Sequence, residues 1–270
     1  MIGDPELRIA GTEVTVTLRR KTLARATLAD FVASVARAGA AWPDLILPSG
    51  VRIFRPRGDC VGVAVEVPPQ ARTVRWIEDD SKGHFGRGTK YRECFLAFPY
   101  VVLLLVLRRG RPSGWQQLYY RRAPLESAES QELLLPNMAN VALAYHQRCW
   151  VCLQHLPPQR NGSLASTVGG VVDHVFNAAF NRSADAHEGN SYWASMRDLD
   201  PRVASLDAWE QATRENRCFA LDVPWKPAGT TASAELATML DHVERPLCGE
   251  PTAEQLAGLV TRAAAARRKS

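Results

Sequence analysis

Short β-type segments, separated by turn residues, follow one another between residues 51 and 121, and this succession limits the possible fold more than any other feature. Valine occupies every second position from Val61 to Val67, and this period of two predicts a strand with one buried face. Pro68 and Pro69 end that segment, because proline cannot donate a hydrogen bond within a sheet. Similar segments cover residues 51–55, 72–77, 94–107 and 115–121. The sequence therefore predicts a meander of about four antiparallel strands.

Helical patterns flank the predicted meander. A strand over 13–20 precedes a helix that begins at Thr27 as N-cap and stops at Gly39. After the meander, hydrophobic residues from Val168 to Phe180 form one stripe at helical spacing, which predicts a helix packed on the sheet. A helix over 206–215 and a short edge segment over 218–223 are expected next. The predicted fold class is α+β, with antiparallel strands flanked by helices.

The C-terminal part is expected to form a helical extension. Residues 228–234 (AGTTASA) resemble a linker, and two short amphipathic helices follow, one carrying Leu236 to Val243 and the other beginning at a capping box at Thr252. These helices could dock on the main domain or on a partner. We therefore predict a domain over residues 1–227 and an extension over 228–270.

Composition and charge restrict the class of protein. The most apolar run, residues 98–107, is about half the ~20 residues that a membrane-spanning helix needs, so it predicts a buried strand. The first residues lack the pattern of a secretory signal, and we expect a cytoplasmic protein with no membrane contact. The net charge of +5 indicates a basic surface. Because no nucleic-acid-binding motif accompanies it, solvated arginines are favoured over specific nucleic-acid binding.

Residues 131–158 concentrate the reactive side chains. A Pro-Asn step ends at Asn137, and Cys149, Cys152 and His155 follow. A thiol becomes a nucleophile when it loses its proton, and a nearby imidazole can take that proton. An Asn amide can donate a hydrogen bond to an oxyanion, so these residue types suggest acyl transfer. The alternative interpretation is structural, since cysteine is among the most buried residue types and Asn after proline is typical of turns.

A zinc site is a further interpretation of this segment. Four potential ligands recur every third residue: His146, Cys149, Cys152 and His155. On a strand this spacing alternates between faces, and on a helix four successive ligands drift around the axis, so one tetrahedral ion cannot collect all four without a turn between them. Two of these ligands, completed by Cys218 or His174, could still form a zinc site, which stays an alternative. The favoured expectation is neither a metal nor another cofactor.

The order of the elements resembles the ubiquitin-conjugating enzyme fold. The motif Leu135-Pro136-Asn137, followed downstream by Cys152-Leu153, is similar to the active-site signature of that superfamily. Within it, residues 47–76 and the Phe-x-x-x-Phe pair at 176 and 180 resemble the prokaryotic ubiquitin-conjugating-like family D, of the PRTRC type found in bacteria. The resemblance covers about residues 10–225.

The resemblance implies that Cys152 accepts a ubiquitin-like protein as a thioester from an activating-enzyme-like protein and passes it to an amine. Asn137 would stabilise the oxyanion. The family lacks the motif histidine of classical conjugating enzymes, and Leu135 stands at that position here, so His155 or His174 would replace it. Fourteen residues separate Asn137 from Cys152, more than in the classical loop, which makes Cys149 an alternative nucleophile. A catalytically inactive version, serving as a protein-binding or assembly subunit of a bacterial mobile-element or defence system, is the alternative function.

Overall fold

The computed structural model describes most of the chain between residues 6 and 244, and the structural statements below concern these residues only: 6–10, 13–18, 21–27, 47, 49–57, 60–77, 91–108, 110–144, 147–153, 163–181 and 191–244. The helix expected after Thr27 and the one expected after Thr252 lie outside the described residues, as does His155.

The described strands fall into two sheets. Their bounds are β1 Glu6–Ala10, β2 Glu13–Leu18, β3 Lys21–Thr27, β4 Val51–Arg57, β5 Cys60–Val67, β6 Gln70–Trp76, β7 Arg92–Phe98, β8 Tyr100–Arg108, β9 Arg111–Arg121, β10 Glu132–Leu134, β11 Val141–Ala144, β12 Gln147–Val151, β13 Ala179–Phe180 and β14 Pro227–Thr231. The larger sheet has the order β11-β12-β9-β8-β5-β4-β1-β2-β3, with β10 pairing β9 and β14, and the smaller one has the order β13-β6-β7.

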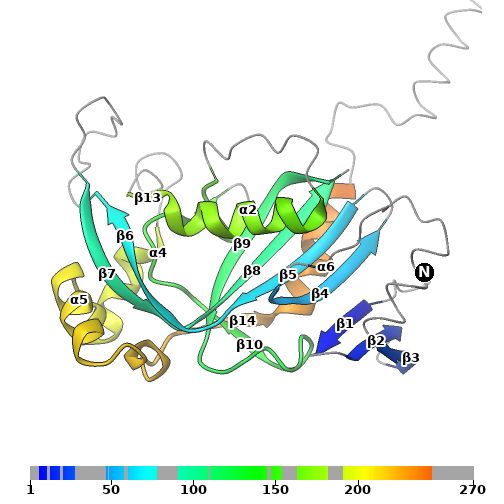
Figure 1. Ribbon diagram of the computed structural model, residues 1–270, viewed down its shortest axis with the longest axis horizontal. Helices are drawn as coiled ribbons and strands as arrows, with labels where there is room; N and C mark the ends of the chain where they lie inside the picture. Colours follow the sequence, from blue (N-terminus) through cyan, green and yellow to red (C-terminus); the bar gives the residue numbers. More distant parts are fainter. Residues whose placement is uncertain are drawn as a thin grey trace, which may run out of the picture.

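The two sheets share two long, bent strands. Strand β5 continues into β6 through Pro68 and Pro69, and β7 continues into β8 through Pro99. The pairing continues across the bend, because Val67 lies opposite Val101 and Gln70 lies opposite Phe98 (Figure 1). With β4 and β9 on either side, these strands form an antiparallel meander. The prolines interrupt the hydrogen-bond ladder there, as predicted, but the chain keeps its partner on both sides of the bend.

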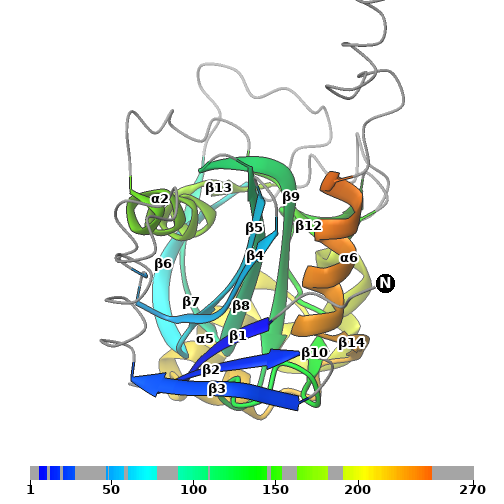
Figure 2. The same ribbon diagram turned by 90° about the vertical axis from the view of Figure 1, so that its right-hand side faces the viewer.

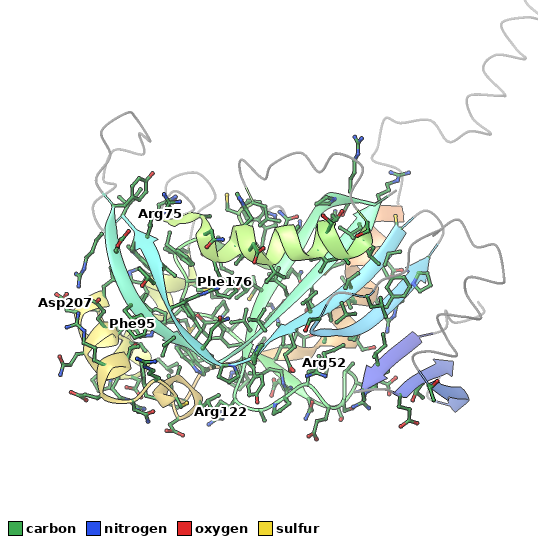
Figure 3. All side chains as sticks on the ribbon, viewed as in Figure 1. Arg52, Arg75, Phe95, Arg122, Phe176 and Asp207 are labelled. Carbon is green, nitrogen blue, oxygen red and sulfur yellow. The ribbon has the colours of Figure 1, made fainter. Side chains whose placement is uncertain are left out.

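Helices cover both faces of the larger sheet. Helix α2 (Leu164–Asn177) and helix α6 (Ala232–Glu244) lie on opposite sides of β5, β8 and β9 (Figure 2). The stripe predicted for α2 is buried, and Phe176 points from the helix toward the bend, where its ring meets Phe98 at 5.6 Å between centroids (Figure 3). The chain is therefore mixed α+β with mostly antiparallel sheets.

Helix α2 ends earlier than its hydrophobic stripe. Ser163 accepts a hydrogen bond from the Ser166 N–H and so caps the first turn, and Ala178, after the last turn, is extended, with φ −63° and ψ 156°. Phe180 therefore belongs to β13, which pairs in parallel with β6. A stripe of buried residues cannot by itself distinguish the last helical turn from a short strand that continues along the same core.

The segment around residue 227 belongs to the packed structure. Residues 227–231 form β14, paired with β10, where a linker was expected. Helix α6 follows at once and lies so close to β5 that a Cβ at Gly62 would come within 3.0 Å of Leu236. Arg55 on β4 donates to the backbone oxygen and the hydroxyl of Ser233 at 3.1 and 2.8 Å. The first of the two predicted C-terminal helices thus docks on the main sheet.

Smaller elements complete the described fold. Helix α5 (Leu206–Glu215) confirms the helix predicted over 206–215 and is capped by Ser205. Short helix α4 (Tyr192–Met196) and the 3-10 turns η1 (Arg197–Leu199) and η2 (Pro201–Val203) precede it. The segment expected as an edge strand after Cys218 is instead a 3-10 turn, η3 (Phe219–Leu221). Within the described residues, no helix has the length and apolar character needed to cross a membrane.

Candidate functional site

A hairpin brings the two ends of the predicted site together. Strands β11 and β12 pair antiparallel, with Val141 opposite Val151, so the chain that leaves Asn140 returns beside it. The N–H of Cys152 donates to the backbone oxygen of Asn140 at 3.0 Å. The hairpin therefore contains most of the fourteen residues between Asn137 and Cys152. It places Cys152 beside Asn140, which follows Asn137 by three residues in the sequence.

Asn137 is fully buried and tied to the sheet. The hydroxyl of Tyr120, on β9, donates to Asn137 Oδ1 at 3.2 Å. Burial raises the pKa of Tyr120 well above its ordinary value, so the hydroxyl keeps its proton and remains a donor. Among the described residues Asn137 Nδ2 has no hydrogen-bond partner. The carboxamide is thus held through its oxygen, while its N–H groups remain available.

Cys149 is a core residue. Its side chain is fully buried, and its backbone has a left-handed φ of 52°, uncommon for a residue other than glycine. Burial raises the pKa of the thiol to about 12, although the hydroxyls of Tyr192 and Tyr119 lie within hydrogen-bonding reach of the sulfur. At neutral pH the thiol keeps its proton, and the neutral thiol is a weak nucleophile. This environment disfavours Cys149 as the alternative nucleophile.

Cys152 has a different environment. It follows the last residue of β12, is half-buried, and packs against a small cluster of Ala142, Ala144 and Trp150 that is separate from the main core. Trp150 is anchored there by its indole N–H, which donates to the backbone oxygen of Gly114 at 3.3 Å. Of the two candidate cysteines, Cys152 is therefore the one with access to a reagent.

Asn140 is a residue that the motif-based reasoning missed. Its side chain is 5% exposed, and neither its Oδ1 nor its Nδ2 has a hydrogen-bond partner in the described part of the chain. A buried polar group without a partner costs about 1–3 kcal/mol. The signal that could have identified it is the register of a β11–β12 hairpin, which places it opposite Cys152.

Of the two predicted histidines, His174 lies within the described residues and His155 does not. His174 is half-buried in the last turns of α2. That end of the helix is fastened to β6, because Arg75 donates to the backbone oxygen of Asn177 at 2.8 Å. Cys152 instead follows β12, next to β9 in the larger sheet. The role of His174 as the base, like that of His155, stays a prediction.

No group of three or more Cys, His, Asp or Glu side chains suited to a metal ion is found among the described residues, which do not include His146 and His155. The comparisons add no relative, since no protein-family model, no curated protein and no solved structure matches this chain.

Proposed function

We propose that this protein accepts an acyl group as a thioester on Cys152 and passes it to an amine, as the resemblance to ubiquitin-conjugating enzymes implies. The observation that supports the proposal most is the β11–β12 hairpin, which returns a half-buried cysteine to a loop with two buried carboxamides, Asn137 and Asn140. The proposed donor is a ubiquitin-like protein loaded on an activating-enzyme-like protein.

The proposed reaction has two steps. The Cys152 thiolate attacks the carbonyl carbon of a thioester, an oxyanion forms, and the donor thiolate leaves with its electron pair and takes up a proton. An amine then attacks the new thioester, the Cys152 thiolate leaves, and the amine nitrogen loses a proton as the amide forms. Each step passes through an oxyanion that a nearby N–H can stabilise.

A peptide ending in Gly-Gly and carrying a C-terminal thioester of mercaptoethanesulfonate tests the proposal without the natural donor. Acylation of the folded protein is followed by intact mass, and the site is assigned by digestion. Cys218, which is exposed, measures the rate of an ordinary thiol within the same chain. We expect Cys152 to be acylated at least about tenfold faster than Cys218, with release by hydroxylamine and loss in Cys152→Ser.

An acylation rate at Cys152 equal to or below that at Cys218 would contradict the proposal. It would leave the second candidate, a catalytically inactive fold that binds other protein subunits in a bacterial mobile-element or defence system. The observation that favours this alternative is the complete burial of Asn137 and its hydrogen bond to Tyr120, which suit a structural residue.

A further inference from the structure

Asn140 and Cys152 lie opposite each other at the open end of the β11–β12 hairpin. The pairing of Val141 with Val151 and of Ala142 with Trp150 sets the register, and the bond from the Cys152 N–H to the Asn140 oxygen extends it by one pair. Residues opposite each other in an antiparallel pair project their side chains to the same face, with Cβ atoms about 4.5–5.5 Å apart. The register therefore places the carboxamide of Asn140 on the same face of the hairpin as the Cys152 thiol.

The state of the Asn140 carboxamide points to a ligand. The side chain is 5% exposed, and within the described residues both of its polar atoms lack a partner. An apolar side chain of similar size would avoid this loss of hydrogen bonding. An amide at this position therefore indicates a hydrogen-bond partner that is present only when a ligand is bound or during a reaction. An oxyanion is such a group, because it forms only during the reaction.

We propose that Asn140 donates from Nδ2 to the oxyanion formed at the carbonyl carbon bonded to Cys152, an inference that rests on the proposed function. The residue thereby takes the role that the resemblance gives to Asn137. In the half-buried surroundings of Cys152, one such hydrogen bond stabilises developing charge more than it would in water.

The position of Asn137 explains why it is the weaker candidate. Its oxygen accepts from Tyr120 on β9, which fixes the carboxamide against the sheet, and Tyr120 is itself packed edge-on against Trp225 at 4.9 Å between centroids. Asn137 also precedes Asn140, the residue opposite Cys152, by three positions. The contacts of Asn137 therefore indicate a structural role in holding the loop.

Two reactions of the same thiol separate an oxyanion donor from a structural residue. Transfer from the Gly-Gly peptide thioester passes through an oxyanion, whereas alkylation by iodoacetamide displaces iodide without one. The variants are Asn140→Ala and Asn140→Leu, which is similar in size and removes the N–H donor without adding a charge, with Asn137→Ala as comparison. Leu143→Ala is the matched control, since Leu143 is 59% exposed on the same hairpin.

We expect both Asn140 variants to acylate Cys152 about 10²-fold more slowly than the wild type, with alkylation of Cys152 and the melting temperature close to those of the wild type. Leu143→Ala should leave both rates unchanged.

Equal slowing of both reactions would overturn the inference, because it would show that Asn140 only maintains the loop. Normal acylation in the Asn140 variants, with slow acylation in Asn137→Ala, would also overturn it while leaving the proposed function intact. If the wild type forms no thioester, the proposed function fails and the role of Asn140 fails with it.

Discussion

Cys149 holds its proton more tightly in the folded protein than in the unfolded chain, because burial raises its pKa from 9.0 to about 12. Above pH 9 the unfolded thiol ionises while the folded one does not, so stability decreases as the pH rises. We predict that the free energy of unfolding falls between pH 9 and pH 10, by at most about 1 kcal/mol per pH unit from this group. Urea unfolding of the wild type and of Cys149→Ala measures the difference, and the variant should show the flatter dependence.

The exposed Cys218 supplies the control for this prediction. Cys218→Ala should retain the wild-type dependence on pH, and a Cys149→Ala variant that also retains it would contradict the account.

The sequence identified Cys149 and Cys152 as candidate nucleophiles but could not rank them. Their ranking depends on the burial of Cys149 beside Tyr119 and Tyr192, residues 30 and 43 positions away in the chain. The sequence could not indicate Asn140 either, because only the register of the folded hairpin places this residue opposite Cys152.

Helix α5 protects the outer edge of the smaller sheet. Strand β7 is the terminal strand there, and side chains of α5 bond to its backbone: Ala97 N–H donates to Thr213 Oγ1 at 2.9 Å, and Phe95 N–H donates to Glu210 Oε1 at 3.1 Å. Phe95 and Asp207 lie at this edge in Figure 3. We predict that Thr213→Val destabilises the fold by about 1–3 kcal/mol, because it leaves the Ala97 N–H buried without its acceptor.

Urea unfolding followed by circular dichroism tests this, with Gln211→Ala, at an exposed position on the same helix, as control. The control should change the free energy of unfolding by less than about 0.5 kcal/mol, and an equally small effect of Thr213→Val would contradict the role given to α5.

The long elements of the fold, such as α5 and β5, were predictable from their periodicity. The short ones were not: β14, with the sequence PAGTT, has the composition of a linker and is a strand because β10 pairs with it from a distance.

Helix α6 helps to hold the described part of the molecule together. Leu236, Met239 and Leu240 of α6 are fully buried against the sheet, and Gly62 makes the close approach possible. We predict that Leu240→Ala lowers the free energy of unfolding by about 2–5 kcal/mol while the transition stays single. Thr238→Ala, at an exposed position on the same helix, should have little effect. Equal effects of the two variants, or a separate early transition, would show that α6 is not part of the main structure and would support the predicted division at residue 227.

Thiol reactivity in the folded protein at pH 7 tests the central claim, that Cys152 is an accessible nucleophile. A small alkylating agent is added in limiting amount, and the labelled sites are assigned by mass spectrometry. We predict that Cys152 is labelled faster than the exposed Cys218, while the buried Cys60, Cys94 and Cys149 react only after unfolding. If Cys152 is also labelled only after unfolding, it is a core residue, the thioester function is excluded, and the binding subunit takes its place.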